Sequence, residues 1–127
     1  MWFWYIMFFF CLQMPIIMFS IGFVWRKNPP KHINDFYGYR TNRSKLNQEN
    51  WDFAHRYFGD LWYKLGIVVL LGTTIVYLFL YKFTYGHTER TSYVTMIIIF
   101  IQLFAMLIPI IPTEIKLKNK DLEIKED

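Results

Sequence analysis

Between residues 31 and 55 the sequence concentrates side chains that can donate or accept hydrogen bonds. Arg40 is the member best suited to an anion, because its planar guanidinium can hold a phosphate or a carboxylate through two parallel bonds. The same group could instead form a structural turn, in which Arg40 caps a helix end or meets lipid phosphate without specificity. The sequence leaves both interpretations open. The group comprises Asn34, Tyr37, Tyr39, Arg40, Thr41, Ser44 and Asn47.

Patterns typical of catalysis or metal binding do not stand out. His32 and His55 are far apart, and neither belongs to an HxxxH or HExxH motif. No Ser-His-Asp arrangement, glycine-rich phosphate loop or paired intramembrane carboxylate is evident. Cys11 is the single cysteine, so no intramolecular disulfide can form. We therefore expect no catalytic residue, no metal and no cofactor, and hence a protein that is not an enzyme.

Three apolar stretches dominate the rest of the chain. Hydrophobic residues make up 54% of the 127 residues, more than a soluble domain of this length could bury. Uncharged segments of roughly 20 residues can cross the ~30 Å hydrocarbon layer of a bilayer as helices. The sequence predicts an all-α integral membrane protein, a single domain over 1–127, with three transmembrane helices. The predicted spans cover about 1–25, 61–83 and 92–112.

The distribution of positive charge predicts the orientation of these spans. Cytoplasmic loops are enriched in basic residues. The connection after the second span carries only Lys82 and Arg90. We therefore expect the N-terminus outside, with the loop 26–60 and the tail 113–127 in the cytoplasm. Positive residues follow the first span rather than precede it, which favours a retained anchor over a cleaved signal peptide. The net charge of +4 thus reflects orientation, and no nucleic-acid partner is expected. The basic residues of the loop side are Arg26, Lys27, Lys31, Arg40, Arg43, Lys45, Arg56, Lys64, Lys116, Lys118, Lys120 and Lys125.

The loop between the first two spans has an internal order. Pro29 and Pro30 end the first helix, and Gly38, between two tyrosines, supplies a turn conformation. From Asn47 onward, apolar residues recur at spacings of three and four, which predicts an amphipathic helix on the cytoplasmic side, leading into the second span with a bend at Gly59. Its aromatic stripe would lie in the headgroup region or pack on the Tyr37–Tyr39 turn. Ser44 or Asn47 would cap its start. The stripe comprises Trp51, Ala54, His55, Phe58, Leu61, Trp62 and Leu65.

Polar residues and prolines inside the spans also need partners. Pro15 frees a backbone carbonyl of the first span. Gln13 and Gln102 lie at similar depth, so they could bond to each other, or each could bond to a neighbouring backbone carbonyl. Gly66 and Gly72 would allow another helix to approach the second span. Glu114, at the inner end of the third span, could pair with a loop arginine, either Arg40 or Arg43.

The order of these loop residues resembles the signature of the SdpI family of bacterial membrane proteins, and Thr113–Glu114 is similar to the end of that family's domain. The resemblance implies a multi-pass protein of the bacterial cytoplasmic membrane. It also implies bacteriocin-type immunity, which is resistance to a toxic peptide, and signal transduction through a cytoplasmic regulator. The residues that carry it are Pro29, Pro30, Lys31, Ile33, Asn34, Tyr37, Gly38, Tyr39, Arg40, Thr41, Ser44, Asn47, Trp51 and Ala54.

Besides a purely structural subunit of a larger complex, two main hypotheses for function follow. The first is a non-enzymatic immunity or signalling protein, whose partners are the lipid bilayer, a toxic peptide or a cytoplasmic regulator, and a second copy of the chain. The second is a membrane enzyme or transporter component that binds a lipid or an anionic ligand at the cytoplasmic face. Both place the binding site in the loop and at the end of the third span. The candidate site residues are Asn34, Tyr37, Gly38, Tyr39, Arg40, Thr41, Ser44, Asn47, Trp51, His55 and Glu114.

Overall fold

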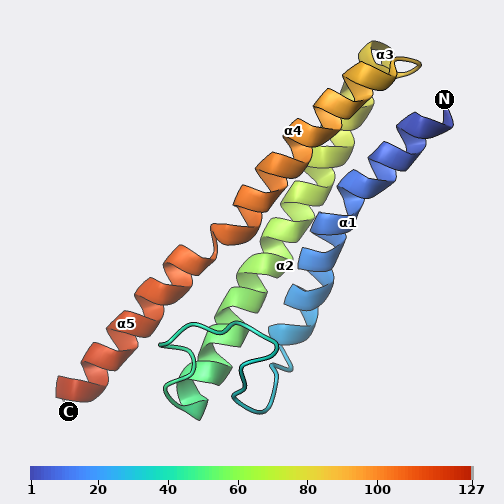
Figure 1. Ribbon diagram of the computed structural model, residues 1–127. Helices are drawn as coiled ribbons and strands as arrows, with labels where there is room; N and C mark the ends of the chain where they lie inside the picture. The colour runs from blue at the N-terminus through green and yellow to red at the C-terminus, as the bar shows by residue number, and fades with distance from the viewer. Residues whose placement is uncertain (127) are drawn as a thin grey trace.

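The computed structural model describes residues 1–126, a bundle of helices whose long members lie side by side (Figure 1). Between residues 1 and 126 there is no strand. Three helical stretches are long and apolar enough to cross a membrane, which confirms the predicted class. The loop between α1 and α2 lies at the opposite end of the bundle from α3, and the chain ends lie at opposite ends of the molecule. The helices are α1 (Trp2–Trp25), α2 (Gln48–Phe79), α3 (Tyr81–Thr84), α4 (Thr88–Leu107) and α5 (Ile110–Glu126).

Two helix boundaries differ from the predicted ones. The amphipathic helix and the second span form one helix, α2, which continues through Gly59 without interruption. Gly59 serves packing, because a Cβ there would lie 2.8 Å from the backbone nitrogen of Arg26. The predicted third span, 92–112, contains a break in the helix, since α4 stops at Leu107 and Pro109 lies between it and α5. The predicted tail is helical over 113–126, within α5.

Glycines bring α1 and α2 into close contact. Added Cβ atoms would collide with the Tyr63 backbone at Gly22 and would lie 2.7 Å from the Phe19 nitrogen at Gly66. The prediction for Gly66 is therefore confirmed. Gly72 has nothing within 4 Å of an added Cβ, so no helix within residues 1–126 approaches it closely, and its role in the approach of a partner helix stays a prediction. Backbones at this distance exchange dispersion contacts that larger residues would prevent, and the small residues thus fix α1 against α2.

A side-chain amide from α4 ties the three long helices together inside the apolar region. Pro15 has no N–H, so the carbonyl of Cys11, four residues earlier, has no helical partner. Gln102 Nε2 donates to this carbonyl and to Thr73 Oγ1, both at 2.9 Å. Of the two predicted alternatives, the bond to a backbone carbonyl is confirmed for Gln102, and the pairing with Gln13 is not formed, because Gln13 lies exposed on the surface of α1.

Candidate functional site

The loop tip is an ordered turn built by Asn34. Its Oδ1 accepts the backbone N–H groups of Phe36 and Tyr37, each at 2.9 Å, and its Nδ2 donates to the carbonyl of His32. Asparagine side chains commonly close turns of this kind by substituting for a backbone carbonyl. Asn34 therefore shapes the loop, and its polar atoms are used within the turn.

The centre of the loop is attached to α2 through His55. The backbone N–H of Tyr39 donates to His55 Nε2 at 2.8 Å, and His55 Nδ1 lies 2.7 Å from the carbonyl of Trp51. A carbonyl only accepts, so Nδ1 carries the proton and Nε2 accepts. Burial lowers the pKa of His55, which favours this neutral form. Gly38 has φ +103°, and a Cβ there would lie 2.6 Å from His55 Nε2, so the loop approaches only through a glycine.

Two further sets of hydrogen bonds complete the path into α2. Thr41 and Ser44 exchange bonds between side chain and backbone, at 2.9 and 3.2 Å, while Ser44 Oγ also donates to the carbonyl of Tyr39 at 2.9 Å. Asn47, rather than Ser44, caps α2, because its Oδ1 accepts the N–H of Asn50 at 2.7 Å. The polar groups of these residues therefore form hydrogen bonds within the loop and at the start of α2.

The aromatic stripe of α2 packs on the loop, which decides between the two predicted environments. Trp51 Nε1 donates to the carbonyl of Pro30 at 2.7 Å. Tyr39 and Phe58 rings have centroids 4.8 Å apart, and both are buried. The stripe therefore serves as the base of the loop.

The loop is also joined to α5. Tyr39 Oη donates to Glu114 Oε1 at 2.6 Å. Burial, then the neighbouring carboxylate, raises the pKa of Tyr39, so the phenol stays protonated and remains a donor. Leu117, one turn further along α5, is fully buried in a cluster with Tyr39, Ala54 and Phe58. Together these contacts hold α5 against both the loop and α2.

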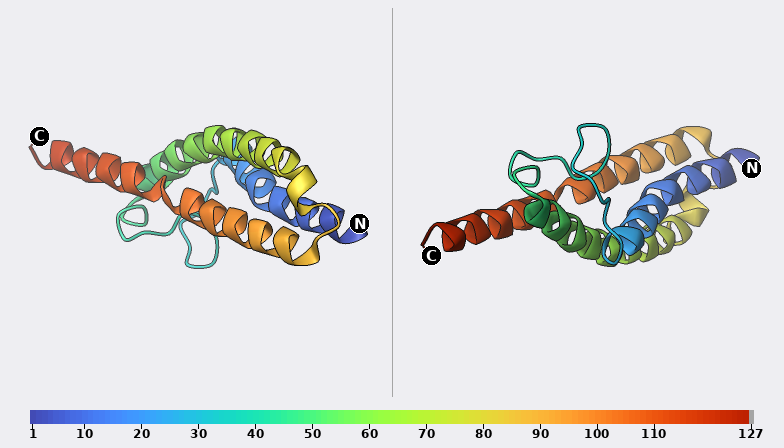
Figure 2. Two further views of the ribbon diagram at one scale, coloured as in Figure 1. Left: turned by 90° about the horizontal axis from the view of Figure 1, so that it is seen from above. Right: turned by 90° about the horizontal axis from the view of Figure 1, so that it is seen from below.

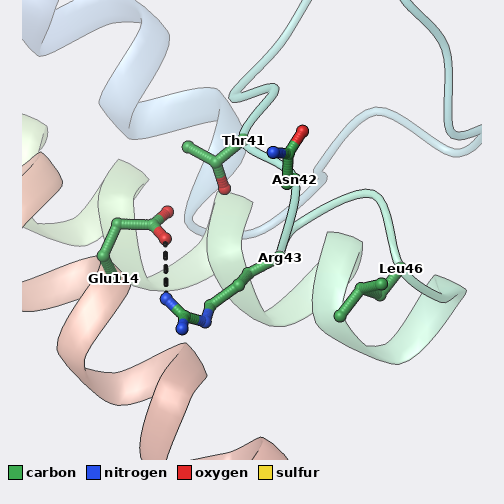
Figure 3. Close-up of a pocket in the computed structure, with 5 residues that line it drawn as sticks. All are labelled: Thr41, Asn42, Arg43, Leu46 and Glu114. Carbon is green, nitrogen blue, oxygen red and sulfur yellow. Dashed lines mark ion pairs between the residues drawn. The ribbon is translucent and has the colours of Figure 1, made fainter.

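Charged residues surround the junction at which Tyr39, Glu114 and Leu117 join the loop to α2 and α5. Arg43 lies 3.9 Å from Glu114 and 4.0 Å from Asp121, and Lys120 pairs with Glu49 at 2.8 Å. Arg43 and Glu114 point toward each other across an open hollow of about 540 Å³ (Figure 3). The cation that faces this hollow is therefore already balanced by carboxylates of α5. The hollow is lined by Thr41, Asn42, Arg43, Leu46 and Glu114.

The candidate residues separate into two groups. The structure brings Tyr39, His55 and Glu114 together in the junction, with Gly38, Thr41, Ser44, Asn47 and Trp51 beside them. Tyr37 and Arg40 are exposed and lie outside the junction. They belong to the loop tip, residues 33–40 apart from the buried Tyr39, together with Asn34. Arg40 donates to the backbone carbonyl of Asp35, so the arginine that meets Glu114 is Arg43.

Three junction residues escaped the sequence analysis. Asn50 Nδ2 donates to the carbonyl of Arg43 and to Asp121 Oδ1, both at 3.0 Å, and Leu117 is completely buried. For Leu117 and Asp121 the signal was their spacing from Glu114, which places these three residues on one face of a helix. That signal requires the tail to be read as a helix, which its charged composition obscured.

Comparison with known proteins identifies the family of this chain. The model of the SdpI/YfhL protein family matches residues 31–113, which is more than half of the chain. The protein belongs to the SdpI/YfhL family. The resemblance predicted from the loop residues is thereby confirmed, and the match covers α2, α4 and most of the loop. Glu114, which bonds to Tyr39, follows the last matched residue.

A curated relative supports the same assignment. This SdpI/YfhL member is 39% identical over 64 residues to a Bacillus subtilis (strain 168) protein described as uncharacterized protein YfhL. The alignment spans 46% of this chain and 58% of that relative, so this chain matches somewhat more than half of the relative's length. No solved structure matches the chain.

Proposed function

We propose that this SdpI/YfhL protein is a non-enzymatic immunity and signalling protein of the bacterial cytoplasmic membrane. It would protect the membrane against a toxic peptide and pass the presence of that peptide to the cytoplasm through its loop. The observation that carries the proposal is the hydrogen bond from Tyr39 to Glu114, which connects the loop to the segment directly after the third span.

The path from membrane to loop is short. α4 ends at Leu107, Pro109 interrupts the helix, and α5 then places Glu114 and Leu117 on the loop. A proline break lacks one backbone hydrogen bond and concentrates bending at one place. Only Ile108 and Pro109 connect the two helices, so a displacement of the end of α4 would pull on the start of α5 and change its contact with the loop.

The surface between α2 and α4, within the apolar region, offers a place where a peptide could bind. An apolar hollow of about 220 Å³ lies between α2 and α4, and Gly72 leaves it open. At its floor, Gln102 holds α4 to both other long helices. A peptide helix in the bilayer that entered this hollow would change the spacing of α2 and α4. The hollow is lined by Val69, Gly72, Thr73, Val76, Ile98, Ile101, Gln102 and Ala105.

The alternative of an enzyme or transporter component with an anionic ligand has weaker support. Its natural site is the hollow beside Arg43, but Glu114 and Asp121 both lie within 4.0 Å of that guanidinium. Two carboxylates beside one cation make the local charge negative, which opposes an anionic ligand.

The proposal is tested by expressing the chain in a bacterium that is sensitive to a membrane-depolarising toxic peptide and measuring membrane potential after challenge with that peptide. Cells that carry the chain should keep their potential. Tyr39→Phe should abolish the cytoplasmic response, while Tyr37→Phe, which removes an exposed hydroxyl, should not. Loss of potential in cells that express the protein at normal levels would refute immunity. An unchanged response with Tyr39→Phe would refute the route through the loop.

A further inference from the structure

The loop tip presents apolar surface on a rigid turn. Phe36 is 88% exposed and Tyr37 57% exposed, although Asn34 fixes the backbone of both. Ile33, in the same turn, is also exposed. Burial of such apolar surface would be favourable by about 25 cal/mol per Å², and the exposed side chains of this turn do not obtain that stabilisation within the chain. Because the turn is ordered without them, their position is fixed before any partner binds.

Two cations converge on the same turn. Lys45 Nζ bonds to the Asp35 carboxylate at 2.9 Å, and the Arg40 guanidinium donates to the Asp35 carbonyl. Lys45 lowers the pKa of Asp35, so the carboxylate stays charged and balances one cation. Within residues 1–126, Arg40 forms no ion pair with an acidic side chain. The tip thus combines exposed aromatic rings with one unbalanced positive charge.

The location of the tip suits a membrane surface. The loop begins directly after α1, whose last residue, Trp25, contacts His55 with ring centroids 4.9 Å apart. Figure 2 shows the loop projecting to one side of the bundle, instead of continuing along its axis. A segment that leaves a transmembrane helix and extends sideways runs along the headgroup layer of the surrounding lipids.

We propose that the loop tip docks on anionic lipid headgroups beside the bundle, with Phe36 and Tyr37 inserted at the interface and Arg40 on a lipid phosphate. Aromatic residues favour this layer, and anionic lipids attract juxtamembrane cations. This docking does not depend on the proposed immunity function. It holds the loop, and with it the Tyr39–Glu114 junction, at a fixed depth relative to the membrane.

The test uses the full chain in lipid vesicles with a fluorescent probe at position 37. Tyr37→Cys is introduced in a Cys11→Ser background, labelled with an environment-sensitive fluorophore, and reconstituted in phosphatidylcholine with or without phosphatidylglycerol. In vesicles containing phosphatidylglycerol, the probe should be quenched by lipids that carry a spin label near the headgroup and protected from aqueous iodide. Asn42→Cys, in the other part of the same loop, is the matched control and should remain accessible to iodide in both.

Two variants identify the residues responsible. Arg40→Gln should reduce the ratio of docked to undocked protein about fivefold, the effect expected for one basic residue near an anionic surface. Phe36→Ser should reduce docking in both lipid compositions, because it removes apolar insertion. Equal iodide access at positions 37 and 42 in anionic vesicles would overturn the proposal. Protection of position 37 in cells but not in vesicles would also overturn it, and would assign the tip to a protein partner.

Discussion

Gln102 Nε2 donates to the backbone carbonyl of Cys11 at 2.9 Å, and that carbonyl is available because Pro15 lacks an N–H. A proline in one span and a glutamine in another thus form one structural unit. Thr73, the second acceptor of the amide at 2.9 Å, extends the unit to α2. Polar links of this kind hold transmembrane helices together where lipid provides no hydrophobic drive between them.

Replacing the glutamine should therefore weaken the bundle. Gln102→Leu leaves the Cys11 carbonyl unpaired and should cost about 1 kcal/mol in the free energy of unfolding, measured by denaturant titration in detergent micelles. Gln13→Leu is the control and should cost nothing, because Gln13 is exposed on α1. A double-mutant cycle adds a sharper check. In a Pro15→Ala background the restored N–H can bond to Cys11, so Gln102→Leu should cost less there. Equal costs in both backgrounds would contradict the coupling.

The glycines of the α1–α2 contact should differ sharply in their tolerance of alanine. Gly66→Ala forces a Cβ to within 2.7 Å of the Phe19 backbone, so the helices must separate and stability should fall by about 2 kcal/mol or more. Gly72→Ala meets nothing within 4 Å, and alanine's higher helix propensity should make it neutral or slightly stabilising. Thermal unfolding in the same detergent compares the two. Similar melting temperatures for both variants would argue against the packing described.

The junction between loop and α5 should depend more on the Tyr39 hydroxyl than on the charge of Glu114. Tyr39→Phe removes a buried donor to a carboxylate and should cost about 1–2 kcal/mol. Glu114→Gln keeps an oxygen acceptor for Tyr39 and loses only a partly exposed pair with Arg43 at 3.9 Å, so its cost should stay below 1 kcal/mol. Hydrogen exchange of α5 amides reports the difference locally. Faster exchange in Glu114→Gln than in Tyr39→Phe would reverse this assignment.

Stability should fall when the medium becomes mildly acidic. The folded pKa of His55 lies below its ordinary value of 6.5, because burial disfavours the charged ring. The unfolded chain then binds more protons than the folded chain below that value, so the stabilisation is complete above about pH 6.5 and is lost as pH falls toward the folded pKa. His55→Gln can still accept the Tyr39 N–H but cannot titrate, and should remove the dependence. His32→Gln, at an exposed position, should retain it. Denaturant midpoints between pH 5 and 7.5 provide the measurement.

The sequence by itself determined the class of the protein, its three spans and its family. Apolar stretches such as 1–25 must be helical in a bilayer, because an unpaired backbone there is too costly. Local chemistry also limited the cap of the second helix to Ser44 or Asn47, of which the structure selects Asn47, and the predicted role of Gly66 in helix contact is confirmed. The sequence alone nevertheless could not reveal whether the polar side chains of the loop bind a ligand or hold the loop together.

Only the tertiary structure decided the partners. Arg40 and Arg43 are equivalent in sequence, yet Arg43 alone lies beside Glu114, since α5 packs against that part of the loop. Gln102 bonds to Cys11 rather than Gln13, because the relative rotation of two helices fixes which residues face each other. Hydrophobic patterns are degenerate with respect to such rotations. The contacts between residues distant in the chain, including the one from Tyr39 to Glu114, therefore depend on packing that no local pattern encodes.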